Sequence, residues 1–136
     1  MNRVLFCIAF LSVMAGCQLP AERMPLRPLA EDSQPLPYSE LLTRARYQAT
    51  AATEAFYVNR WTDLEDLAKG LDQTARFMKK ATEVPASLRD KLAEQADALS
   101  QEAQHLLEAA RAQDVRRTNE IMQRINLKVR ELRLDS

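Results

Sequence analysis

Apolar residues recur at helical spacing through most of the chain. From Ser39 onward they stand three and four residues apart in four consecutive blocks, which is the pattern of amphipathic helices. The blocks carry Leu42, Ala45, Ala49, Ala52 and Phe56; then Trp61, Leu64, Ala68, Leu71, Ala75 and Met78; then Leu88, Leu92, Ala96, Leu99, Ala103, Leu106 and Ala110; and last Val115, Thr118, Met122, Ile125, Val129 and Leu132. No block has the period-two alternation of a strand. The pattern therefore predicts an all-α domain over residues 39–136.

Helix-start signals separate the four blocks. They are Ser39 for the first helix, Asn59 or the Thr62–Glu65 capping box for the second, Pro85 and Ser87 for the third, and Asp114 for the fourth. Because the connections are short, neighbouring helices are expected to run antiparallel, as an up-down-up-down four-helix bundle that folds as a monomer. The alternative is a long helical hairpin that dimerises, which the alanine-rich first block would also suit.

The first sixteen residues have the layout of an export signal. A positive residue precedes the apolar run Val4–Met14, which is too short to span a bilayer as a permanent helix. Small residues at positions 15 and 16 then precede Cys17. The quartet Met14–Cys17 resembles the lipobox of bacterial lipoproteins, with methionine in place of the usual leucine. The resemblance implies cleavage after residue 16 and acylation of Cys17 as the new N-terminus, with palmitate among the acyl chains.

Acylation of Cys17 would set both the location and the thiol chemistry of the mature chain. Several acyl chains on one residue make a stable membrane anchor. The residue after the cysteine is Gln18 rather than aspartate, which in the enterobacterial members of the lipoprotein family implies the outer membrane, facing the periplasm. Anchoring in the inner membrane or facing the exterior stays open, as do an ordinary signal peptide and an uncleaved anchor. Cys7 is removed with the signal, so no thiol is left for a disulfide, a zinc site or covalent haem.

The segment between the cysteine and the first helix is rich in proline. Five of the six prolines fall at positions 20, 25, 28, 35 and 37. Proline favours extended backbone, so residues 17–38 are expected to act as a semi-rigid tether that holds the bundle away from the membrane. The alternative, a segment folded back along the domain, finds no support in the apolar pattern.

Charge is balanced overall but not along the chain. The sequence has 19 basic and 19 acidic residues, which argues against a nucleic-acid partner. The third predicted helix is mainly acidic and the fourth mainly basic. The favoured interpretation is that these oppositely charged helices attract one another and that cations suit the C-terminal end of a helix. The alternative is a candidate surface for an acidic envelope partner or a lipid headgroup on the fourth helix, formed by Arg116, Arg117, Arg124 and Lys128.

The last part of the chain, EAARAQDVRRTNEIMQRINLKVRELR, together with the bundle pattern and the export signal, resembles the cytochrome c-prime group and its b-type four-helix relatives. In that family the last helix carries Cys-x-x-Cys-His. Here Ile125 and Lys128 stand at the cysteine positions and Val129 stands at the position of the haem-ligating histidine. The resemblance thus implies the family's fold with its haem site lost, and we expect no prosthetic group.

One further pair of residues suggests noncovalent haem as an alternative. Spacing places His105, the one histidine of the chain, roughly level with Met122 across the third and fourth helices. Polar residues share the face of His105, however, among them Glu102 and Glu108. A solvated surface histidine is therefore the favoured interpretation.

Other chemistry is sparse. No Ser/His/Asp arrangement, phosphate loop or Glu-x-x-His motif occurs in the sequence. The aromatic residues Tyr47, Phe56, Tyr57 and Trp61 are expected near one end of the first hairpin, for packing or, less conventionally, as a ligand pocket. The sequence therefore favours a non-catalytic interaction or scaffold module on a lipid anchor. The alternative is a bundle that binds a small ligand or a metal, which needs polar groups in the core, where the apolar blocks offer only Thr118.

Overall fold

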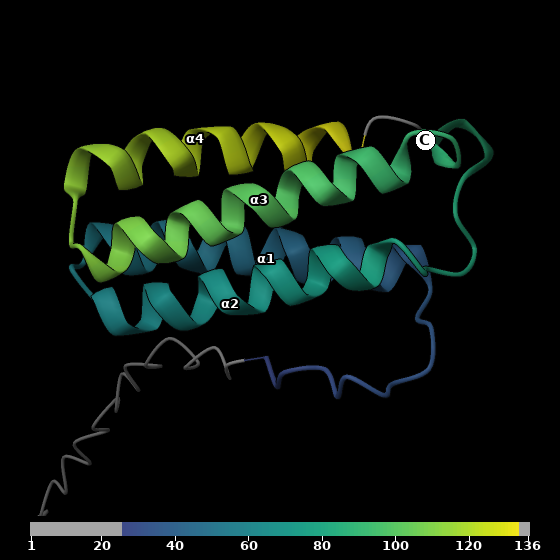
Figure 1. Cartoon of the computed structure of the whole chain (residues 1–136), viewed down its shortest axis with the longest axis horizontal. Helices are drawn as coiled ribbons and strands as arrows, with labels where there is room; N and C mark the ends of the chain where they lie inside the picture. The colour runs from purple at the N-terminus through teal and green to yellow at the C-terminus, as the bar shows by residue number, and fades with distance from the viewer. Residues whose placement is uncertain (1–25, 134–136) are drawn as a thin grey trace, which may run out of the picture.

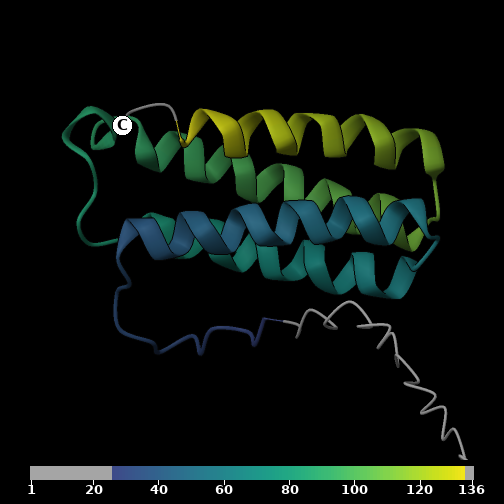
Figure 2. The same ribbon diagram turned by 180° about the vertical axis from the view of Figure 1, so that it is seen from behind.

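Four helices packed side by side form the part of the chain that the computed structural model describes, residues 26–133 (Figures 1 and 2). They are α1 (Tyr38–Tyr57), α2 (Trp61–Met78), α3 (Leu92–Arg111) and α4 (Val115–Glu131), with a short 3₁₀ helix η1 (Ala86–Leu88) between α2 and α3. Each helix packs against the next one, and α1 packs against α4. The predicted all-α, up-down-up-down four-helix bundle is confirmed.

The core is built from leucine and alanine. The predicted faces of α2, α3 and α4 are buried almost throughout, although Val115 at the start of α4 is exposed. On α1 the buried face differs from the prediction by one residue, since Leu41 and Ala55 are fully buried while Leu42 and Phe56 lie at the margin. Small alanine side chains at helix contacts permit a close approach of the axes.

A polar pair is buried between α1 and α2. The Thr74 hydroxyl lies 2.8 Å from Oε1 of Gln48 and 3.0 Å from the carbonyl oxygen of Gly70. A Cβ at position 70 would lie 2.8 Å from Nε2 of Gln48, so glycine makes room for the amide. The expectation that Thr118 alone places a polar group in the core is therefore wrong, because Gln48 and Thr74 lie there too. Thr118 is buried, and its hydroxyl has no hydrogen-bond partner among the described residues.

The predicted helix starts are confirmed at one position and wrong at others. The Asp114 side chain caps α4 by accepting a hydrogen bond of 2.9 Å from the backbone N–H of Arg117. By contrast, α1 begins directly after Pro37 and includes Ser39, and α2 begins after Arg60, neither with a side-chain cap. Asn59 forms the turn instead, with a φ of 57°, a left-handed conformation that asparagine tolerates better than most residues.

The residues before α1 lie along the bundle. We name residues 26–37 the strap. The backbone N–H of Leu29 donates to Oε1 of Gln73 at 2.9 Å, and Nε2 of Gln73 donates to the Leu29 carbonyl at 2.6 Å. Nearer to α1, the N–H of Thr82 donates to the Leu36 carbonyl at 2.9 Å. The side chains of Leu29 and Leu36 pack against the core.

The strap corrects the expectation of a tether that leads away from the bundle over residues 17–38. Proline gives the strap an extended backbone, and two leucines and one glutamine amide attach that backbone to α2. The predicted signal peptide, Cys17 and the first part of the tether lie outside the described residues, so the lipoprotein hypothesis stays a prediction.

Candidate functional site

Three of the four cations predicted to form a partner surface have carboxylate partners. Arg117 Nη2 lies 3.0 Å from Oε2 of Glu108, and Arg124 Nε lies 2.9 Å from Oε1 of Glu102. Both carboxylates belong to α3. The third cation, Arg116, pairs with Glu120 of α4 itself at 3.0 Å. Along this part of α4 the structure thus has the internal pairing that the sequence favoured. Exposed pairs of this kind are each worth about 0–1 kcal/mol.

The strongest of these pairs involves Glu102, whose side chain is only 14% exposed. Its hydrogen bond raises the pKa of Arg124 above the ordinary value. The other carboxylate oxygen, Oε2, is buried without a hydrogen-bond partner and lies 3.8 Å from Nδ1 of His105. The His105 side chain is 40% exposed, whereas Met122 is buried in the core. His105 therefore occupies the flanking, partly solvated position predicted for it.

The positions aligned with the haem motif lie in different surroundings. Ile125 and Val129 are buried in the bundle core, and Lys128 is half-buried at its edge. The apolar side chains at 125 and 129 thus serve packing between helices.

Lys128, the fourth predicted cation, lines a groove between the start of α3 and the end of α4. We name this the charged groove; its volume is about 290 Å³ and its lining residues are Lys91, Glu94, Gln95, Ala98, Lys128 and Glu131. Within residues 26–133 none of its two lysines and two glutamates forms an ion pair. Oε1 of Gln95 is buried there without a hydrogen-bond partner. A groove with unpaired groups of both signs suits a polar segment that itself carries both signs of charge.

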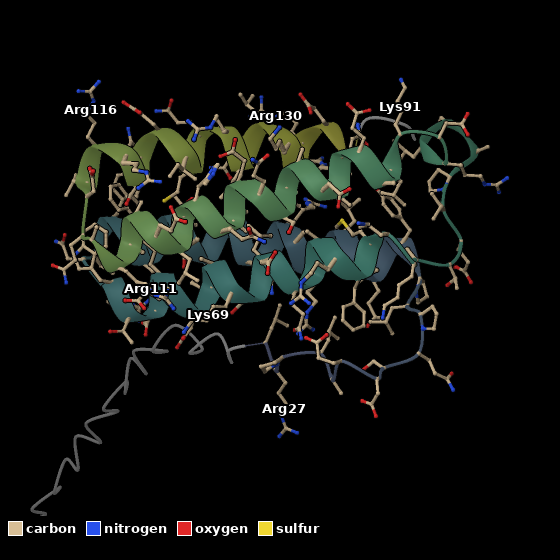
Figure 3. The ribbon with its side chains drawn as sticks, in the orientation of Figure 1. Arg27, Lys69, Lys91, Arg111, Arg116 and Arg130 are labelled. Atoms are coloured by element: carbon tan, nitrogen blue, oxygen red, sulfur yellow. The ribbon has the colours of Figure 1, made fainter. Side chains whose placement is uncertain are left out.

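Arg130 continues this cationic end of α4. It is exposed, and no described carboxylate lies within ion-pair distance of it. Figure 3 shows Lys91 and Arg116 at opposite ends of the bundle, with Arg130 between them on α4. Unpaired charge of both signs therefore lies toward the end where α3 begins, with Lys91, Lys128 and Arg130 as its cations. The sequence alone did not place Lys91 beside Lys128, because their proximity depends on the antiparallel pairing of α3 with α4.

Exposed apolar side chains gather at the opposite end of the bundle. We name it the tip, formed by Phe56, Tyr57, Val58, Trp61 and Val115, where α1 ends, α2 begins and α4 begins. Tyr57 is 71% exposed, and Val58 and Val115 are each 59% exposed. The Phe56 ring lies edge-on to Trp61 with centroids 5.8 Å apart, and 5.6 Å from the Tyr57 ring.

Tyr47 does not join the tip. It lies ten residues before Tyr57 on α1, about 15 Å away at the rise of an α-helix. Its neighbours around a shallow surface depression are Thr43, Arg46 and Thr50. The predicted aromatic cluster therefore comprises three aromatic residues rather than four.

Within the described part of the chain, residues 26–133, no three His, Cys, Asp or Glu residues are grouped as metal ligands. None of its helices is both long and apolar enough to cross a membrane. Comparisons with protein-family models, curated proteins and solved structures found no match to this chain.

Proposed function

We propose that this protein is a lipid-anchored component of the bacterial cell envelope whose haem-free bundle is a non-catalytic interaction module. The N-terminal pattern and Cys17 supply the anchor, and the bundle supplies a surface for an envelope protein. The partner surface is centred on the charged groove and Arg130. It therefore overlaps the surface expected from the sequence at Lys128 and extends from there onto α3.

The choice of the charged groove as the partner surface rests on its unpaired charges. Arg116, Arg117 and Arg124 are each satisfied by a carboxylate, while the charged groove holds four charged side chains without a described counter-ion. Charges that have no partner within the fold remain available to one outside it. Complementary charge steers encounter and selects partners more than it adds affinity. A protein segment with both signs of charge would satisfy the groove and the Gln95 amide together.

The test is a capture experiment from native envelopes with the acylated protein as bait. Lys128→Glu combined with Arg130→Glu should lose a partner that the wild-type protein retains after chemical crosslinking. Arg46→Glu is the matched control, because Arg46 is an exposed cation on α1 with no ion pair among the described residues. Equal capture by all three proteins would contradict the proposed surface.

A second candidate function is the binding of a small zwitterionic ligand in the same groove. Its volume of about 290 Å³ is near the lower limit for a small-molecule pocket, roughly 300 Å³. Native mass spectrometry of the protein purified from envelopes separates the two functions. A bound small molecule that is lost in Lys128→Glu, together with no retained protein, would favour the ligand over the protein partner.

A further inference from the structure

We infer that the tip rests in the interfacial region of the membrane that holds the lipid anchor, so that the bundle stands with its charged groove away from the bilayer. This inference rests on the proposed lipid anchor at Cys17. The tip would contact the zwitterionic headgroup layer of the bilayer rather than a protein.

The first support is the distribution of exposed apolar side chains. Five large hydrophobic residues are exposed within residues 26–133: Leu26, Tyr57, Val58, Val115 and Leu127. Three of them belong to the tip, where the partly buried Trp61 lies in the same group of side chains. Tyrosine and tryptophan favour the membrane–water interface, since each has an apolar ring and a polar group. The tip therefore has the composition of an interfacial contact.

The second support is the course of the strap. It starts beside the beginning of α1 and runs along α2 toward the tip, as both views show (Figures 1 and 2). Its contact at Gln73 lies twelve residues from Trp61, or about 18 Å along the helix. From Leu26 to Cys17 there are nine residues, which reach at most about 30 Å. The chain is thus long enough for an anchored Cys17 to share a membrane surface with the tip.

The length of chain between Cys17 and Leu26 would also allow other faces of the bundle to contact the membrane. The distribution of charge favours the tip over those faces. Cations beside the tip are paired: Arg60 with Asp63 at 3.3 Å, Arg111 with Glu65 at 3.7 Å. Asp114 at the start of α4 is the exception, since it forms no ion pair among the described residues and accepts only the backbone N–H of Arg117. The opposite end carries the four unpaired charges of the charged groove, and charged groups are unfavourable in the apolar part of a bilayer. The bundle accordingly meets the membrane through its tip.

Trp61 is the one tryptophan of the chain and reports directly on this contact. The mature chain, coupled through Cys17 to a maleimide lipid, is placed in phosphatidylcholine vesicles brominated near the headgroup end of one acyl chain. Bromine quenches tryptophan on contact, so Trp61 should lose the larger part of its emission relative to unbrominated vesicles. Added salt should leave the loss unchanged, because the contact is apolar.

Two matched variants test whether the exposed apolar residues of the tip make the membrane contact. Tyr57→Ser, Val58→Ser and Val115→Ser together should restore emission to that of unbrominated vesicles, while Leu127→Ser should leave the quenching intact. All of these side chains are more than half exposed, so the core is unchanged, which circular dichroism verifies.

Failure of this inference is distinguishable from failure of the anchor. Chemical coupling keeps the protein on the vesicle whether or not the cell acylates Cys17, and flotation of the vesicles confirms that it is there. Full Trp61 emission from protein that floats with brominated vesicles would overturn the tip contact. A Trp61 shift that depends on protein concentration in the absence of lipid would also overturn it, in favour of self-association through the tip.

Discussion

The two ends of the bundle differ in the kind of side chain that they expose to solvent. At the tip, the turns are short, the neighbouring arginines Arg60 and Arg111 are paired, and apolar side chains face outward. At the opposite end, a longer connection with η1 joins α2 to α3, and four charged side chains line a groove without a described partner. The main exposed feature of the tip is therefore apolar surface, whereas that of the other end is unpaired charge.

The difference bears on how such a bundle would work in an envelope. Unsatisfied groups of either kind are the usual basis of recognition, because binding removes an existing cost. Apolar surface suits an interface with lipid, and unpaired charge suits a polar partner. The two ends therefore suit different neighbours, and the strap lies along α2 between them.

The largest expected effect comes from removing the proposed lipid anchor, which would hold the tip rather than the charged groove near the membrane. Cys17→Ser should abolish lipid incorporation and leave uncleaved precursor, because the hydroxyl does not replace the thiol that is acylated. Metabolic labelling with a fatty acid and fractionation of membranes measure both effects. Cys7→Ser is the control and should change neither. Processed, membrane-bound protein from the Cys17→Ser variant would refute the lipoprotein hypothesis.

The helical pattern was sufficient to predict the bundle, since apolar periodicity is retained wherever a helix buries one face. It predicted the buried face of α2 and α3 closely. On α1 the predicted buried face was wrong by one residue, because the alanines fit either of two neighbouring faces. Leu41 is buried there in place of the predicted Leu42. A small side chain carries little information on which direction is buried.

The site was harder to predict from the sequence. Charge asymmetry identified α4, but Arg117 and Arg124 pair with α3 and Arg116 pairs within α4, so that of the four predicted cations Lys128 alone has no ion pair among the described residues. Its neighbour Lys91 lies outside the periodic part of α3, so no local pattern marks it. The strap was missed because proline indicates extended backbone but not the surface on which that backbone lies; Leu29 and Gln73 are 44 residues apart.

The second prediction concerns the hydrogen bonds that hold the strap to the side of the bundle. Gln73→Ala removes the two hydrogen bonds to the Leu29 backbone, together worth about 1–3 kcal/mol. The Leu29 amide should then exchange with solvent roughly tenfold faster or more, while amides in the centre of α3 keep their rates. Gln123→Ala is the control, because Gln123 is exposed on α4 and has no hydrogen bond among the described residues. Unchanged exchange at Leu29 would show that the strap is held without Gln73, by its leucine contacts and its other polar contacts, such as the hydrogen bond from Thr82 to Leu36.

The smallest expected effect is a difference in stability between variants at the starts of two helices, one at each end of the bundle. Asp114 caps α4 at the tip, so Asp114→Ala should lower the free energy of unfolding by about 1 kcal/mol. Ser39, which the sequence also marked as a cap, lies inside α1 at the other end and makes no side-chain cap. Ser39→Ala should therefore leave stability unchanged or slightly higher, since alanine is the better helix former. Urea denaturation of both variants with unchanged slopes measures the two values on one scale. Equal losses in the two variants would mean that the end of α1 near the strap uses a serine cap in solution, and the contrast between the two ends would not extend to their helix caps.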